Sequence, residues 1–171
     1  TGTSMNINGN VLNRGSVITS GGDTIRITRD LLNYGIWQTS FTYLTDTGAI
    51  CGHFNNPLAY LFIQADRYLQ GNVILSCNTN FSGIITTSLH DTVIVLTDSF
   101  NRLSGYIQGN LALPVPVGNP VLQFPMGDVS GYTPVEVQFN GVSANGQMTL
   151  SLKTGIHPLI AQPDRVLRRH W

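Results

Sequence analysis

The chain repeats the stretch GNVLNRGSV at residues 9–17, which returns as RDLLNYGIW at residues 29–37. Leu12, Asn13 and Gly15 come back as Leu32, Asn33 and Gly35, all three with the same offset. A weaker copy, YLQGNVI, occupies residues 68–74, and the fragment GNL at residues 109–111 ends the series. Repeats of this length that combine β-branched residues, Asn and Gly predict strands stacked coil upon coil, that is, a β-solenoid.

A solenoid gives each repeated residue a physical role. Every coil buries a row of Leu, Ile or Val against the coil before it, and an Asn at a fixed corner can bond to the next Asn about 4.8 Å away. We therefore expect Leu12 and Leu32 to point inward in successive coils, with Asn13 stacked over Asn33 at one corner. The gap between the second and third copies requires either an extra coil or an inserted loop.

The remaining local signals are those of an all-β chain. No long stretch carries apolar residues at helical spacing, whereas short β-branched runs such as residues 24–28 and 92–96 recur between Gly, Asn and Asp clusters. This spacing of short strands is also typical of an immunoglobulin-like β-sandwich. The sandwich is the alternative fold, in which the repeats would be hairpins that resemble one another by chance.

The chain divides into two regions that differ in their sequence patterns. Residues 1–113 carry the repeat and are predicted to be the solenoid-like region; the proline-bounded stretch PVPVGNP at residues 114–120 then interrupts the strand pattern. Residues 114–171 are predicted to be a small antiparallel, sandwich-like cap. Within it, residues 135–139 and 148–152 alternate apolar and polar side chains, and Asn145-Gly146 predicts a hairpin turn between them.

Composition indicates where such a chain works. Of its 171 residues only 11% are charged and the formal net charge is zero, against about 25% charged residues in ordinary soluble domains. Asn, Thr, Ser, Gln and Gly must supply the polar surface, which favours an extracellular β-protein. Nucleic acid is not an expected partner, because the only basic cluster is small. No apolar run reaches 18 residues, so no membrane-spanning helix is predicted.

The chain contains two cysteines, Cys51 and Cys77, whose separation in the sequence is close to the length of one coil. In an oxidising compartment they could pair, and the loop-entropy estimate for such a bond is about 3 kcal/mol of stabilisation. Because the even count accompanies a secreted type of composition, we expect a disulfide. The alternative is a pair of buried free thiols.

Residues 106–171 carry a set of motifs in a characteristic order: YIQGNL at 106–111, FPMGD at 124–128, GYTPV at 131–135, His157-Pro158, and VLRRHW at 166–171. This order resembles a module of large secreted surface proteins of Bacteroidota and related bacteria, in which β-helical stretches often precede it. Met126 and His170 stand where that family has Val and Tyr. The resemblance implies a surface location and a scaffold or adhesion role, with no catalytic residues.

The resembling family continues through one more strand beyond Trp171. A sheet that lacks this strand has an open edge, which a neighbouring chain can complete. We therefore expect identical or related chains as partners, with residues 3–11 of one copy filling the edge of the next to form a filament. In a longer polypeptide the strand would simply lie downstream. Asp23-Thr24-Ile25 and Asp91-Thr92-Val93 also resemble the family's O-glycosylation acceptors, with Thr24 and Thr92 as the modified residues.

Few residues suggest chemistry. The carboxylates are scattered, the histidines lack metal-ligand spacing, and no catalytic, cofactor or metal site is predicted. Aromatic side chains are a better indication, since a planar row could stack on sugars or form a subunit interface. Core packing is the alternative for them. The candidate aromatics are Tyr34, Trp37, Tyr43, Tyr60 and Tyr68.

These observations favour a non-enzymatic extracellular structural module of a bacterial surface protein or a self-assembling fibre. A glycan-binding adhesin module is the alternative, and it would be supported by an open aromatic row. A carbohydrate-active β-helix enzyme is the more distant alternative, because it requires carboxylates such as Asp30 and Asp66 to gather on one face.

Overall fold

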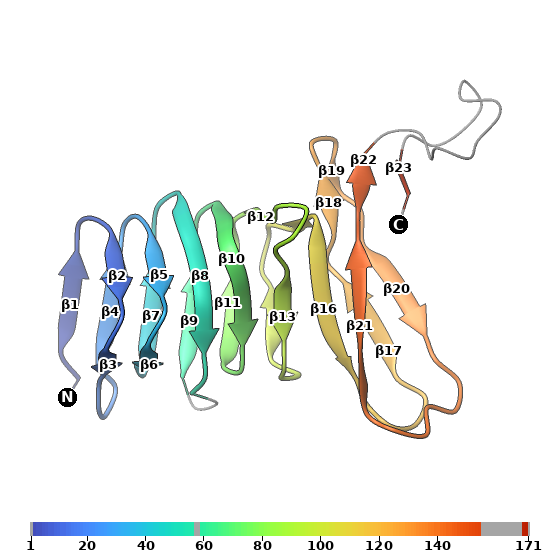
Figure 1. Ribbon diagram of the computed structural model, residues 1–171, viewed down its shortest axis with the longest axis horizontal. Coiled ribbons are helices and arrows are strands. Elements are labelled where there is room, and N and C mark those ends of the chain that lie inside the picture. The colour runs from blue at the N-terminus through green and yellow to red at the C-terminus, as the bar shows by residue number, and fades with distance from the viewer. Residues whose placement is uncertain (1, 57–58, 155–168, 171) are drawn as a thin grey trace.

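A computed structural model describes residues 2–56, 59–154 and 169–170 of the chain. This part of the chain contains strands and no helix, and it forms a β-solenoid of about six turns. Successive coils stack side by side along the long axis of the molecule, as Figure 1 shows. The prediction of an all-β solenoid is therefore confirmed.

Two parallel sheets form the walls of the solenoid. Sheet A consists of β1 (Ser4–Ile7), β4 (Thr24–Ile27), β7 (Phe41–Leu44), β9 (Tyr60–Ile63), β11 (Asn78–Phe81) and β14 (Phe100–Arg102). Sheet B follows the path β2 (Val11–Asn13), β5 (Leu31–Asn33), β8 (Gly48–Phe54), β10 (Arg67–Leu75), β13 (Val93–Val95), β16 (Asn110–Val115) and β21 (Gly146–Ser151).

Shorter strands complete the described structure. β3 (Ser16–Ile18) pairs with β6 (Ile36–Gln38) at the turn that follows sheet B, and β12 (Ile85–Thr86) pairs with β10 and β15 (Ile107–Gln108). The strands beyond β16 are antiparallel pairs: β17 (Val121–Phe124) with β20 (Val135–Gln138), β18 (Gly127–Asp128) with β19 (Gly131–Tyr132), and β22 (Lys153–Thr154) with β23 (Arg169–His170).

The repeat sets the register of the first coils. Leu12 pairs with Leu32 and Asn13 with Asn33 in a parallel ladder, which is the register that the repeat predicts. This parallel pairing excludes the immunoglobulin-like sandwich, whose strands pair antiparallel. The gap before the third copy holds an extra coil, in which β7 and β8 pair with β4 and β5.

The predicted facing of Leu12 and Leu32 is wrong. Leu12 is 57% exposed and Leu32 is half-buried, whereas their neighbour Leu31 is fully buried. Side chains alternate along a strand, so burying Asn13 and Asn33 also turns Val11 and Leu31 inward and places the two leucines outside. The buried amides lose no hydrogen bonding, because they bond to one another and to backbone carbonyls.

The core is a continuous stack of inward-facing apolar rows. In sheet A one such row runs from Ile7 through Ile27, Leu44 and Ile63 to Phe81, and all but Ile7 are at most 1% exposed. Each coil thus buries its apolar face only against its neighbours, which is the energetic pattern of a solenoid.

The solenoid ends where sheet B changes from parallel to antiparallel pairing. β16 is parallel to β13 on one side and antiparallel to β21 on the other. The predicted boundary between residues 113 and 114 falls inside β16, and Pro114 does not interrupt the strand but pairs with Gln147. Only Leu111 and Ala112 of β16 pair with β13, so Pro114 lies beyond that ladder, where the missing N–H is tolerated.

The predicted hairpin around Asn145-Gly146 is also wrong. β20 pairs with β17 and β21 pairs with β16, so the two strands do not form a ladder with each other. The Asn145 side chain instead accepts a hydrogen bond of 3.1 Å from the Val117 N–H. The alternation of polar and apolar residues identified both strands correctly, but it carries no information about which strand pairs with which.

Some predictions concern the chain ends. Residues 3–11, predicted to donate a strand to another copy, build β1 and begin β2, where they pair with β4 and β5. His157-Pro158 and residues 166–168 and 171 of the terminal motif lie outside the described residues.

Candidate functional site

Two of the predicted aromatics, Tyr43 and Tyr60, belong to a stacked ladder on the outer face of sheet A. Tyr43 stacks on Phe62 with ring centroids 4.4 Å apart and planes within 8°, and Phe41 stacks on Tyr60 at 5.5 Å and 16°. Each pair joins β7 to β9, adjacent strands in Figure 1. Arg26 covers Tyr43 with its guanidinium carbon 4.3 Å from the ring centroid. The paired ring faces therefore contact one another, and the ladder stabilises coil stacking.

The other predicted aromatics lie elsewhere. Trp37 is 3% exposed and belongs to the core. Tyr34 and Tyr68 are exposed, but Tyr68 lies in β10 of sheet B and Tyr34 directly follows β5 of the same sheet. The five candidates thus do not form one row. Sequence reasoning missed Phe41 and Phe62, although the spacing of Phe41 with Tyr43 and of Tyr60 with Phe62 places each pair on one face of a strand.

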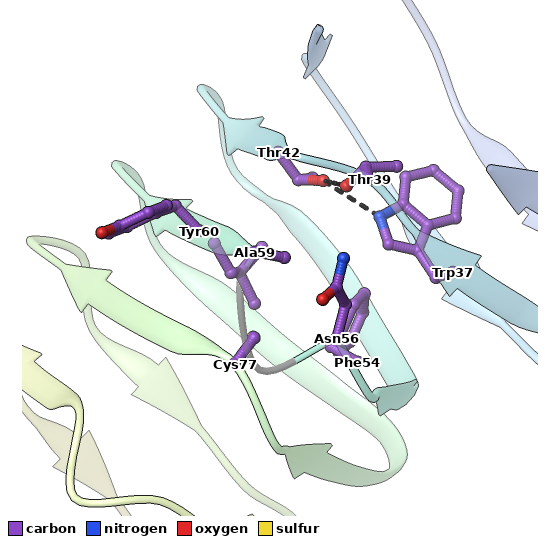
Figure 2. A pocket seen from close by; sticks show the side chains of 9 residues that line it. Trp37, Thr39, Thr42, Phe54, Asn56, Ala59, Tyr60 and Cys77 are labelled. Carbon is purple, nitrogen blue, oxygen red and sulfur yellow. Dashed lines mark hydrogen bonds between the residues drawn. The ribbon is translucent and has the colours of Figure 1, made fainter. Parts of the chain in front are cut away.

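A small cavity lies beneath Trp37 at the corner between the two sheets (Figure 2). Its volume of about 10 Å³ has room for about one water molecule. The Trp37 indole N–H donates to Thr42 Oγ1 at 3.0 Å, and this oxygen lies 2.6 Å from Thr39 Oγ1. The buried hydroxyls are thus bonded within the wall of the solenoid. The cavity is too small for a sugar or any larger substrate.

The predicted disulfide is absent: Cys51 and Cys77 are both free, buried thiols. Cys51 pairs in register with Leu32, whose row faces outward, while Cys77 belongs to the hydrophobic core. Cys51 thus lies in the outward row of sheet B, whereas Cys77 lies between β10 and β11 and packs in the core. Tyr34 covers Cys51 and bonds to it, which raises the pKa of the Tyr34 hydroxyl. Burial raises the pKa of the Cys77 thiol, which also contacts Thr79 Oγ1 at 3.6 Å.

Asn and Asp side chains form the second set of inter-coil contacts. Asn10 Oδ1 accepts a hydrogen bond from the Asp30 N–H at 3.3 Å, and Asp30 Oδ1 accepts one from the Ala49 N–H at 2.7 Å. Later coils repeat the arrangement, with the Asp66 carboxylate bonding the Ile84 N–H and the Asn72 amide bonding the Thr92 N–H. Asp30 and Asp66, the candidate carboxylates of a β-helix enzyme, thus act as backbone caps.

One charged side chain is buried without full compensation. Arg67 is 1% exposed, and it donates from Nη1 to the Arg29 carbonyl across the space that Gly48 leaves open. Its Nε and Nη2 have no hydrogen-bond partner among the described residues. Desolvation lowers the pKa of Arg67 to about 10, while nearby Asp30 and Asp46 act in the opposite direction. Arg67 occupies a buried position of β10, and the sequence analysis did not identify it.

A hollow lined mostly by residues with polar side chains, the polar hollow, lies where the last coils meet the antiparallel region. It has a volume of about 610 Å³. Hydroxyl, amide and charged side chains of Thr87, Ser88, Gln108, Asn110, Asp128 and Lys153 contribute to its lining. Asn110 Nδ2 donates to the Asp91 carbonyl at 2.9 Å, and Asp128 Oδ1 accepts from the Ser130 N–H at 2.8 Å. These contacts fix the walls of the hollow. No group of three metal-ligating side chains occurs among the described residues.

The two predicted glycosylation residues lie next to the solenoid corners. Thr24 begins β4 and is half-buried, and the preceding Asp23 accepts hydrogen bonds from the Thr3 N–H and hydroxyl at 2.7 and 2.8 Å. Thr92 is half-buried in front of β13, with its N–H bonded to Asn72 Oδ1.

Comparison with known proteins returns no matching family model, no matching curated protein and no matching solved structure. Within the described part of the chain, no helix is long and apolar enough to cross a membrane.

Proposed function

We propose that the chain is a non-enzymatic structural module, a stiff β-rod in an extracellular surface protein or fibre. The observation that carries this proposal is the use of polar side chains as links between coils. Asn13, Asn33, Asp30, Asp66 and Asn72 each bond a group in an adjacent coil. Side chains with these contacts support the backbone of the rod and are not free to act on a substrate.

The geometry suits a load-bearing spacer. Backbone hydrogen bonds between coils run along the long axis, and the first and last coils lie at opposite ends of the solenoid (Figure 1). Stacked aromatic pairs and the buried Asn13–Asn33 pair resist sliding of one coil over the next. The low charge supports an extracellular setting, because little of this cohesion depends on ion pairs that salt would screen.

Force spectroscopy tests the structural role. With the chain pulled from its two ends, we expect coils to detach in small steps, each releasing about 20 residues or roughly 7 nm of extended chain. Removing the aromatic pair with Phe62→Ala should lower the force of the step that contains β9, while Tyr68→Ala, on sheet B, should leave that step unchanged. Rupture at forces no higher than those of an unstructured linker would reject the structural role.

Glycan binding is the second candidate function, and the polar hollow is what favours it. Its size of about 610 Å³ and its hydroxyl and amide lining suit a short oligosaccharide. A glycan array decides between the two functions. Saturable binding that Gln108→Ala abolishes and Gln123→Ala preserves would establish the adhesin role. Absence of binding, together with stepwise rupture under force, supports the structural role.

A further inference from the structure

The chain contains three Asn-Gly dipeptides, at residues 8–9, 140–141 and 145–146. In such a pair the backbone nitrogen of Gly can attack the side-chain amide carbon of Asn, because Gly has no Cβ to obstruct the approach. The attack requires a Gly N–H that is not held in a hydrogen bond and a backbone that can turn toward the amide. The surroundings of the three pairs therefore decide which of them reacts.

The pair at residues 140–141 is exposed, but its nitrogen is held. The Gly141 N–H donates to Asn119 Oδ1 at 2.7 Å. Gly141 also has a φ of 77°, which fixes it in a turn conformation. A nitrogen bonded in this way becomes available for attack only when the local structure opens.

The pair at residues 145–146 is held by a strand. Gly146 begins β21 and pairs with Val115 of β16. In the same antiparallel ladder the Leu152 N–H donates to the Gly109 carbonyl, which fixes the alternation of the bonds. By this alternation Gly146 and Val115 form a hydrogen-bonded pair, so the Gly146 nitrogen is not available either.

The pair at residues 8–9 is different, because nothing holds it. It lies in the loop between β1 and β2, at the blue end of the molecule in Figure 1. Asn8 is exposed, and no hydrogen bond joins its side chain or the Gly9 N–H to another described residue. Nothing lies within 4 Å of a Cβ on Gly9, whose φ is not positive. Asn10 of the same loop lines an open hollow of about 350 Å³, so water reaches this loop.

We propose that Asn8-Gly9 is a self-modification site, at which the chain converts Asn8 to aspartate or isoaspartate without an enzyme. The Gly9 nitrogen bonds to the Asn8 side-chain carbon, and its proton passes through water to the amide nitrogen, which leaves as ammonia. Water then adds to either carbonyl carbon of the resulting five-membered imide. The bond from that carbon to the ring nitrogen breaks, and the nitrogen regains a proton. One water enters and one ammonia leaves, without a redox step.

The product alters the first coil, which consists of β1, β2 and β3. Among the described residues this coil pairs with one other coil only. Isoaspartate inserts a methylene into the backbone between β1 and β2, which puts these strands out of step with β4 and β5. Ageing therefore loosens the first coil before the others. This inference goes beyond the proposed function, since it holds whether the rod bears load or binds a glycan.

Peptide mapping by mass spectrometry on the full chain, stored at mildly alkaline pH, tests the site. In the folded chain, acid should form at residue 8 at least about tenfold faster than at residues 140 and 145, which is the ratio that one protecting hydrogen bond supplies. In urea the three rates should agree within about threefold, because unfolding removes the protection. The proposal is overturned if residue 140 or residue 145 of the folded chain reacts as fast as residue 8.

A matched pair of glycine substitutions tests the attacking nitrogen. Gly9→Ala should slow the reaction at Asn8 at least about tenfold, because the methyl group obstructs the attack. The substitution should not disturb the fold, since the space around Gly9 is open. Gly15→Ala, at another glycine with open space and no positive φ, should leave the rate at Asn8 unchanged. Equal rates at Asn8 in the two variants would also overturn the proposal.

A third variant tests the protection itself. Asn119→Ala removes the acceptor of the Gly141 N–H. The rate at Asn140 should then rise severalfold toward the rate at Asn8, while the rate at Asn8 stays the same. If the rate at Asn140 does not rise, the hydrogen bond is not what distinguishes the two pairs, and the explanation for the selectivity at Asn8 fails.

Discussion

The coils of the solenoid and the antiparallel strands beyond it differ in how they pair their strands and bury their side chains. In the inner coils, strands such as β5 and β9 are covered by equivalent strands on both sides, and their inward residues are almost fully buried. In β17 and β20, one two-stranded ladder carries side chains that are mostly half-buried or exposed. Periodic stacking therefore concentrates stability in the coils, and the antiparallel strands serve chiefly to close sheet B.

The largest expected effect comes from the inward apolar row. Leu31→Ala removes a fully buried side chain from the second coil and should reduce the free energy of unfolding by about 3–4 kcal/mol, because neighbouring coils cannot collapse into the cavity. Leu122→Ala, at a half-buried residue of β17, should reduce it by only about 1 kcal/mol. Urea denaturation measures both. Equal losses would contradict the difference between the two regions.

The buried, hydrogen-bonded pair of Asn13 and Asn33 gives the next largest effect. Asn33→Ala should destabilise the chain by about 2–3 kcal/mol, since it removes the acceptor of Asn13 and the donor to the His53 carbonyl inside the wall. Gln123→Ala breaks an exposed bond to Glu136 in the antiparallel region and should change the stability by less than about 0.5 kcal/mol. The comparison fails if the two substitutions have similar costs in thermal unfolding.

Alkaline pH should act mainly through the coils. Burial raises the pKa of the Cys77 thiol above its usual 9.0, so the folded state holds this proton more tightly than the unfolded state. The stability that results is complete below pH 9 and declines as the pH rises above it. The difference in unfolding free energy between pH 8 and pH 10 should therefore be smaller in Cys77→Ala. An identical difference in the variant and the parent would show that Cys77 is not the titrating group.

The smallest effect is expected at acid pH in the first coil. Hydrogen bonds from the Thr3 backbone and hydroxyl lower the pKa of Asp23 below 3.8. This contribution is present above pH 4 and is lost as the pH falls through the lowered pKa. The protection factor of the Thr3 amide, its exchange rate relative to an unstructured peptide at the same pH, should therefore fall at acid pH in the parent chain. In Asp23→Asn the protection factor should no longer depend on pH in this range, and a retained dependence would assign the effect to another carboxylate.

The repeat made the fold predictable but not the facing of every residue. Leu12 and Asn13 align with Leu32 and Asn33 in both sequence and structure, because equivalent residues of equal coils stack directly. Strand β2 contains only Val11, Leu12 and Asn13, and its two adjacent apolar residues leave the alternation ambiguous. Which side chains of β2 face the core depends on whether the Asn amide finds hydrogen-bond partners there. Only the neighbouring coil supplies those partners.

The candidate site was less predictable for a related reason. Composition suggested that Trp37 and Tyr43 belong to one surface, but one is buried and the other is stacked on Phe62. Cysteine spacing suggested a bond between Cys51 and Cys77, yet Cys51 lies in the outward row of β8 and Cys77 packs in the core between β10 and β11. In both cases the outcome depends on which side of a strand a residue occupies. A shift of one residue moves a side chain to the other face of the strand. Aligning the repeats, without knowing which way each side chain points, therefore cannot decide the outcome.

The in-register stacking of coils is tested most directly by spin labels at residues 12 and 32, introduced as Leu12→Cys and Leu32→Cys after both native cysteines are replaced by Ala. Strand spacing places these backbone positions ~4.8 Å apart in neighbouring coils, with both side chains outside the core. A pair at residues 121 and 138, opposite each other in the antiparallel ladder, serves as the positive control. We predict that the double label at residues 12 and 32 shows strong dipolar broadening of its electron paramagnetic resonance spectrum, as the control does. A spectrum equal to the sum of the two singly labelled proteins would contradict the stacked-coil account.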